Sequence, residues 1–101
     1  MTTGVLRPAE LRSLLQTFKE QHAHEYGLNA LGYFGSYARG EADGESDIDI
    51  VFDTDAPSLF KTAMMKQDLE ACLGRSVDVI RLRGTTNRRL KARVEKEAIY
   101  V

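Results

Sequence analysis

The sequence predicts an α/β (α+β) fold in which a small mixed β-sheet is covered by helices. Segments 47–52 and 77–82 alternate apolar and polar residues as half-buried strands do, and 28–34 is a short apolar run. Two longer segments, 8–26 and 58–73, instead repeat apolar residues at spacings of three and four, as one face of a helix does. Helices and strands therefore alternate along the chain, which favours a sheet packed against helices.

The composition is that of one globular domain, which we expect to span residues 1–101. Hydrophobic residues make up 43% of the chain and charged residues 29%, so the mixture can bury one core. The single cysteine, Cys72, excludes a disulfide framework and argues against a cysteine-based zinc site. No apolar run approaches the roughly 18 residues of a membrane helix, and no signal-peptide pattern begins the chain. We therefore expect a cytoplasmic protein with no membrane partner.

The first half of the chain contains a long helix, a strand and a tight turn. Pro8 suits the first turn of a helix, and Gly27 suits the position just after its last residue. The strand 28–34 follows directly and ends at a Gly-Ser pair. Residues 36–39 are then expected to form a single helical turn before a polar, acidic loop.

The second half of the chain contains two further helices around the strand 77–82. Ser58 suits the N-cap of a helix that Gly74 ends. Its apolar side is predicted to consist of Phe60, Met64, Leu69, Cys72 and Leu73. A basic helix is expected at about 87–96, and residues 98–101 are expected to add a short edge strand or a docked tail.

The charges are strongly segregated although the net charge is only −1. Residues 41–55 hold seven of the fifteen acids and no base, whereas 81–96 hold seven of the fourteen bases and one acid. The simplest interpretation is two solvated faces. The basic helix could also dock a partner or bind nucleotide phosphates, and the sequence does not rank these roles. Nucleic acid is a possible partner that nothing specifically indicates.

A Gly-Ser turn followed by two aspartates contains the residues that we expect to bind a metal ion and a phosphate. Asp47 and Asp49 are two residues apart on a predicted strand, so both carboxylates project from one face, roughly 6–7 Å apart. Such a pair can bracket Mg²⁺, which prefers one or two carboxylates together with phosphate oxygens. Upstream, Gly35 and Ser36 offer backbone N–H groups and a hydroxyl to a phosphate. This combination is the minimum equipment for phosphoryl or nucleotidyl transfer.

A third acid strengthens that prediction. Asp78 lies between apolar residues in the strand 77–82, where a carboxylate is costly to bury unless it is paired or bound to a metal. If the strands are neighbours, Asp78 stands beside Asp47 and Asp49. It could then act as a general base or as a further metal ligand.

Three competing interpretations of this segment fail. A calcium loop requires glycine where Ile48 stands, and a P-loop requires lysine and a hydroxyl residue where Glu41 and Ala42 stand. A nucleophilic serine elbow requires glycine where Phe34 stands.

The run Gly-Ser-Tyr-Ala-Arg-Gly at 35–40, followed by Ser-Asp-Ile-Asp-Ile-Val at 46–51, resembles the polymerase-β-like nucleotidyltransferase superfamily. Within it, the chain looks like the smallest branch, the MNT-type minimal nucleotidyltransferases. The resemblance covers about residues 28–82 in motifs and the whole chain in element order. It implies that the turn residues Gly35, Ser36 and Arg39 bind nucleotide phosphates. It also implies that the acids Asp47, Asp49 and Asp78 bind two Mg²⁺ ions. The arginine is expected near phosphate or bracing the loop.

The resemblance also implies a reaction and a partner. MNT proteins act as antitoxins of HEPN-domain toxins encoded beside them, and active members transfer AMP from ATP to a toxin tyrosine. A core of 101 residues has little surface for gripping an acceptor, so we expect the acceptor to bring its own. Two alternatives stay open, a non-catalytic antitoxin that occludes its partner and nucleotidyl transfer to a small molecule or RNA. Nucleotide preference and oligomeric state are also left open.

Overall fold

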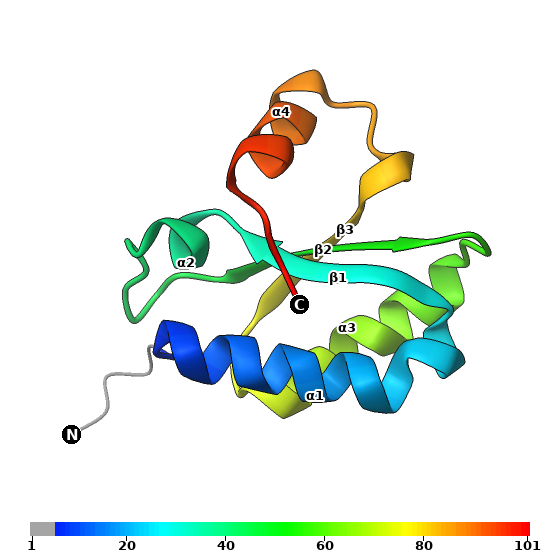
Figure 1. Ribbon diagram of the computed structural model, residues 1–101, viewed down its shortest axis with the longest axis horizontal. Helices are drawn as coiled ribbons and strands as arrows, with labels where there is room; N and C mark the ends of the chain where they lie inside the picture. Colours follow the sequence, from blue (N-terminus) through cyan, green and yellow to red (C-terminus); the bar gives the residue numbers. More distant parts are fainter. Residues whose placement is uncertain (1–5) are drawn as a thin grey trace.

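The computed structural model describes residues 6–101, and its elements follow the predicted order (Figure 1). These elements are α1 (Pro8–Tyr26), β1 (Leu28–Phe34), α2 (Ser36–Arg39), β2 (Ile48–Thr54), α3 (Leu59–Leu73), β3 (Val77–Arg81), the 3-10 turn η1 (Leu82–Gly84), α4 (Arg88–Glu97) and β4 (Ile99–Tyr100). No helix within residues 6–101 is both long and apolar enough to cross a membrane.

The four strands form one mixed sheet in the order β3-β2-β1-β4. β1 is antiparallel to both of its neighbours, whereas β2 and β3 are parallel and are joined through α3, as parallel strands require. The predicted edge strand at the end of the chain is confirmed, because β4 pairs with β1 through Gly32↔Tyr100 and Tyr33↔Ile99. The predicted fold class is therefore confirmed.

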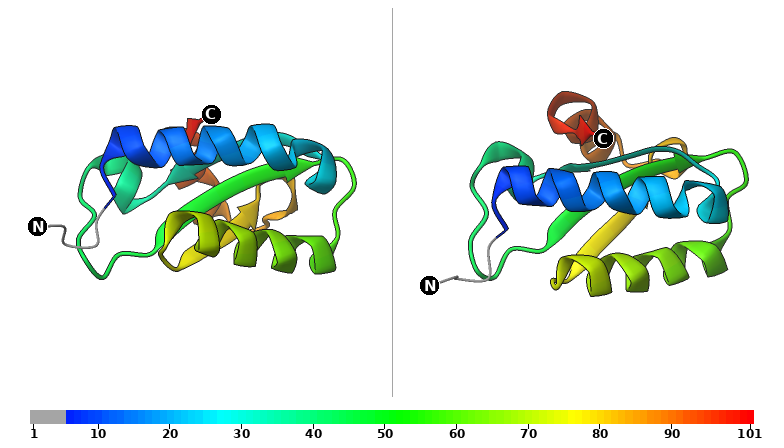
Figure 2. Two further views of the ribbon diagram at one scale, coloured as in Figure 1. Left: turned by 90° about the horizontal axis from the view of Figure 1, so that it is seen from below. Right: turned by 60° about the horizontal axis from the view of Figure 1, so that its bottom comes forward.

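The main core lies between the sheet and the pair α1 and α3, which lie side by side on one face (Figure 2). Ile48, Ile50 and Phe52 reach this core from β2, and Val77 reaches it from β3. The alternation predicted for both strands is thus confirmed, since alternate residues of a strand point to opposite faces.

Helix α4 lies on the opposite face of the sheet (Figure 2), and a smaller apolar cluster lies beneath it. Phe34, Val51 and Val94 are buried there, and the partly buried Leu90 and Ala98 pack against them. This cluster leaves part of the face open, and the site described below occupies that part.

The contacts of α3 and α4 test the predicted Ser58 cap and the predicted apolar side of α3. Ser58 accepts a hydrogen bond from the Lys61 N–H at 3.2 Å, and Asn87 accepts one from the Leu90 N–H at 3.0 Å. The predicted apolar side of α3 is wrong in part: Phe60, Met64 and Cys72 are exposed. The helix packs through Met65, Leu69 and Leu73, which recur every four residues and lie on the side that meets α1 and the sheet.

Candidate active site

Asp49 and Asp78 lie side by side on neighbouring parallel strands. They are partners in the β2–β3 register, so both side chains project from the sheet face opposite the main core. Adjacent strands lie about 4.8 Å apart. The prediction that Asp78 stands beside Asp49 is therefore confirmed.

Asp47 lies just before β2 and is exposed, so the predicted strand 47–52 begins one residue too early. The first ladder position is Ile48, whose N–H donates to the Ser76 carbonyl at 3.0 Å. The charge of Asp47 still acts on Asp49, whose pKa it helps to raise. Within residues 6–101, the three aspartates do not form a group with ligand atoms all within 4.8 Å of one another.

The electrostatics of Asp49 favour a bound proton or cation. Burial raises the pKa of Asp49, the neighbouring charges of Asp78 and Asp47 raise it further, and Arg93 opposes them. No ion pair within 4.0 Å engages any of the three aspartates in the described part of the chain. Their negative charge is therefore uncompensated at close range, and their hard oxygen donors are the type that Mg²⁺ prefers.

Asp78 is exposed, which corrects the argument that it would be costly to bury. β3 is an edge strand of the sheet, so solvent reaches a side chain that its apolar sequence neighbours alone would have predicted to be enclosed. An exposed carboxylate beside a half-buried one remains available to a group that approaches from outside the sheet.

Gly35 lies against the carboxylate of Asp49. Its φ of +74° and ψ of −148° suit glycine alone, and a Cβ at this position would stand 2.1 Å from Asp49 Oδ2. The Gly-Ser turn and the aspartate are therefore in direct contact, although 14 positions separate them in the sequence. Ser36 follows as the first residue of α2, where the backbone N–H groups have no partner within the helix.

Glu97 clamps the same turn and belongs to the candidate site, although sequence reasoning missed it. The Gly35 N–H donates to Glu97 Oε2 at 3.2 Å, and Arg39 Nη1 donates to the same carboxylate at 3.1 Å. Burial would raise the pKa of Glu97, but the hydrogen bonds from Arg39 and Gly35 outweigh it and lower that pKa. Glu97 comes at the end of α4, and only the pairing of β4 with β1 brings it to Gly35, so no local motif marks it.

Arg39 braces the loop after α2. Besides Glu97, it pairs with Glu41 through Nε at 2.7 Å, and these two partners raise the pKa of its guanidinium. Of the two positions expected for this arginine, the structure shows the bracing one.

The carboxylates open into a hollow of about 510 Å³. Asp49 and Asp78 line it together with Phe34, Lys66 and Arg93. Acidic and basic groups thus meet in one cavity beside the Gly-Ser turn, which suits a phosphorylated ligand bound through a cation. A second group of possible ligands, His22, Glu25 and Asp68, lies elsewhere, between α1 and α3.

A mixed sheet with a Gly-Ser turn against paired strand carboxylates defines a nucleotidyltransferase-like site, and comparison with known proteins agrees. Residues 11–101 match the nucleotidyltransferase domain family. The protein adenylyltransferase MntA of Thermococcus cleftensis is 37% identical over 99 residues, covering 97% of this chain and 99% of that protein.

Two solved structures share the fold. A candidate minimal nucleotidyltransferase, 33% identical, superposes with a TM-score of 0.78 and covers 93% of this chain and 95% of its own. The complex of an AMPylated HEPN toxin with its MNT antitoxin from Shewanella oneidensis has a matching chain at 21% identity and a TM-score of 0.65, covering 88% and 70% respectively. The chain belongs to the nucleotidyltransferase domain family, in its minimal MNT-type branch, and is a nucleotidyltransferase.

Proposed function

We propose that this protein is a Mg²⁺-dependent protein adenylyltransferase that transfers AMP from ATP to a tyrosine of a HEPN-domain toxin and so acts as an antitoxin. The observation that carries the proposal is the Asp49–Asp78 pair in register beside the Gly35-Ser36 turn. The activity named for the relative at 37% identity supports the transferred group, and the toxin–antitoxin complex of the same fold supports the partner. The cytoplasm, which supplies ATP and Mg²⁺, stays the predicted compartment, and one domain over residues 1–101 stays the predicted unit.

The six predicted site residues divide into a metal set and a phosphate set. Asp47, Asp49 and Asp78 would hold two Mg²⁺ ions, and we propose that the phosphate set consists of Gly35, Ser36 and Arg39. When bound, the ions would neutralise the negative charge of the phosphates. Ser36 would bind the β- and γ-phosphates through its hydroxyl and the first-turn N–H groups of α2, while Arg39 and Gly35 hold the turn in shape.

The proposed reaction is an in-line displacement at the α-phosphorus of ATP. The tyrosine oxygen forms a bond to that phosphorus, the bond to the bridging oxygen breaks, and pyrophosphate leaves. Asp78 accepts or directs the tyrosine proton, which its exposed position on the edge strand permits. Asp49, half-buried and unpaired, is the group whose charge most needs a cation.

The proposal is tested by incubating the protein with labelled ATP, Mg²⁺ and the product of the neighbouring gene, which we expect to be the HEPN-domain protein. The Asp47→Asn/Asp49→Asn variant is expected to lose labelling at least about a thousandfold, since it removes both strand ligands. Its Tm is expected to equal or exceed that of the wild type, because repulsion at Asp49 is relieved. Glu45→Gln, an exposed acid of the same loop whose side chain makes no ion pair, is the matched control.

Equal labelling by the double variant would overturn the proposal. Neutralisation of the toxin by a variant that no longer labels it would instead identify the occluding antitoxin. Labelling of RNA or of a small molecule in place of the HEPN protein would reassign the acceptor.

A further inference from the structure

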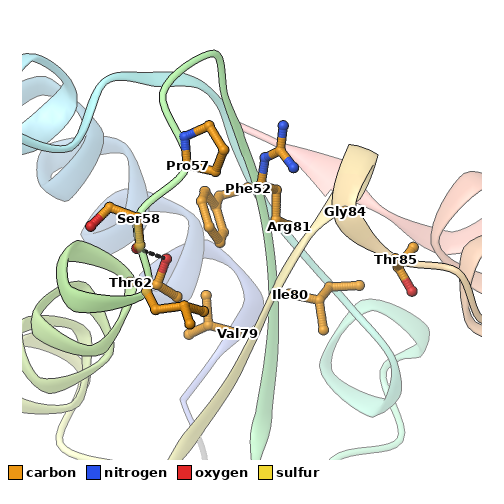
Figure 3. A pocket seen from close by; sticks show the side chains of 10 residues that line it. Phe52, Pro57, Ser58, Thr62, Val79, Ile80, Arg81, Gly84 and Thr85 are labelled. Atoms are coloured by element: carbon orange, nitrogen blue, oxygen red, sulfur yellow. Dashed lines mark hydrogen bonds between the residues drawn. The ribbon is translucent and has the colours of Figure 1, made fainter.

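An apolar hollow of about 460 Å³ lies beside β3, between the start of α3 and the η1 turn (Figure 3). Ser58 and Thr62 lie on one side of it, and Ile80 and Thr85 lie on the other (Figure 3). Its one charged side chain, Arg81, is already engaged, since its guanidinium donates to the Thr54 carbonyl at 3.3 Å. The hollow therefore offers mainly apolar surface to a ligand.

This hollow is continuous with the one that holds the carboxylates. Both are lined by Leu59, Thr62, Val79 and Ile80, and the second extends to Asp49 and Asp78. Together they form a groove along β3, which we call the β3 groove. It leads from Pro57 at its apolar end to Asp78 at the site.

The outer edge of β3 has no strand partner within residues 6–101. A free strand edge presents backbone N–H and C=O groups that can pair with an added extended segment. The wall of the groove thus combines apolar pockets with main-chain hydrogen-bonding capacity, a combination that recognises polypeptide in an extended conformation.

Leu59 adds exposed apolar surface at the rim of the groove. It is 92% exposed at the start of α3 and lines both hollows, where a leucine gains nothing from solvent. An apolar anchor at the rim of a pocket contributes to affinity only when a partner removes it from water.

The geometry of an in-line displacement indicates which substrate the groove binds. Across the sheet, the Gly35-Ser36 turn follows β1 on one side of Asp49, whereas Asp78 and the groove lie on the β3 side. An in-line displacement requires the attacking oxygen and the leaving pyrophosphate on opposite sides of the phosphorus. With the triphosphate at the turn, the acceptor hydroxyl must therefore approach from the side of β3.

We propose that the β3 groove binds the acceptor polypeptide as an extended segment that delivers its hydroxyl side chain to Asp78. This inference rests on the proposed function and names the surface by which the acceptor is held. Single-stranded RNA fits the apolar end of the groove less well, because such ligands need stacking aromatics and free basic groups. At the apolar end the one aromatic side chain, Phe52, is buried and the one basic residue, Arg81, is engaged.

The test compares Leu59→Glu with Phe60→Glu in the labelled transfer assay with the HEPN-domain protein. Leu59 and Phe60 are both exposed apolar residues in the first turn of α3, but Phe60 lines neither hollow. An acid in the first turn is favourable for a helix, so both variants are expected to fold. Leu59→Glu is expected to raise the KM for the acceptor about tenfold or more and to leave the KM for ATP unchanged. Phe60→Glu is expected to change neither.

Equal effects of the two variants, or no effect of Leu59→Glu, would overturn the groove assignment. The proposed function would still stand in that case, provided that the wild type transfers AMP. A raised KM for ATP with an unchanged KM for the acceptor would assign the groove to the nucleobase and overturn the proposal too. If the wild type transfers nothing, the proposed function fails, and calorimetric titration of the HEPN-domain protein in the presence of AMP-PNP still tests the groove. Weaker binding by Leu59→Glu than by Phe60→Glu would support it there, and equal binding would overturn it.

Discussion

The two faces of the sheet differ in what they bury. Among residues 6–101, the face under α1 and α3 is closed by a cluster of fifteen buried residues, whereas the face under α4 has a cluster of three. The smaller cluster leaves room for Asp49 and Asp78, which stand in one row of the sheet with Phe34. Val51 and Ile80 form the next row on the same face. Apolar burial on the first face therefore supplies most of the stability, and the second face can carry like charges.

The difference explains how a short chain tolerates a repulsive site. Partial burial and the nearby charges of Asp78 and Asp47 all raise the pKa of Asp49, so the ionised site opposes folding. Placing it on the lightly packed face, next to an edge strand, lets solvent reduce that cost. The same exposure is what makes the carboxylates accessible to a substrate.

The largest effect that tests this comparison is on stability. Leu69 of α3 is completely buried in the main core, and Leu69→Ala is expected to lower the free energy of unfolding by about 2–5 kcal/mol. Val94 of α4 is as completely buried in the smaller cluster, and Val94→Ala is expected to cost about 1–2 kcal/mol because it removes less apolar surface. Urea denaturation measures both, and a greater loss in Val94→Ala would contradict the division between the faces.

A smaller effect is expected where the Gly-Ser turn meets the carboxylate. Gly35→Ala would place a Cβ 2.1 Å from Asp49 Oδ2, so the aspartate must move, and transfer is expected to fall about a hundredfold. Gly40→Ala is the control for a positive φ without a clash, because its φ of +72° and ψ of +25° lie in the left-handed helical region, which strains alanine less than the Gly35 conformation does, and its Cβ would meet nothing within 4 Å. Rates of labelled transfer normalised to folded protein distinguish the two causes. Equal losses in both variants would show that backbone strain alone matters.

Local sequence patterns predicted most of the fold, and they also predicted the aspartates and the Gly-Ser turn of the candidate site. The alternation in 47–52 and 77–82 assigned each side chain to a face correctly, and Ser58 placed the start of α3, because these signals depend only on neighbours in sequence. The stripe of α3 was misplaced because Phe60 and Cys72 are apolar in type but lie outside the contact with α1.

Tertiary contacts decided the remainder of the site. The register of two strands placed Asp78 beside Asp49, and the edge position of β3 left it exposed. The return of the chain through β4 brought Glu97 to Gly35. Neither relation leaves a periodic trace in the sequence. The β3 groove is likewise a product of sheet order, since it depends on which strand ends at the edge.

The smallest predicted effect concerns the charge of Glu97, which joins the C-terminal end of α4 to the turn. Glu97→Gln keeps an acceptor oxygen for the Gly35 N–H but removes the charge that holds Arg39, so transfer is expected to fall roughly tenfold. Glu95→Gln, an exposed neighbour on the same helix without such contacts, is expected to behave as the wild type.

The pH dependence of stability separates a charged clamp from a merely polar one. Because the pKa of Glu97 is lower in the folded protein than in the unfolded chain, its stabilising contribution is present above the ordinary glutamate pKa. That contribution is lost as the pH falls through the lowered, folded-state value. The difference in unfolding free energy between the wild type and Glu97→Gln is therefore expected to be largest near neutral pH and to shrink on acidification, as urea denaturation at a series of pH values would show. A difference that stays constant with pH would mean that Glu97 acts through its hydrogen bonds and shape and not through its charge. The Arg39–Glu97 ion pair would then contribute nothing to the stability of the face that carries the site.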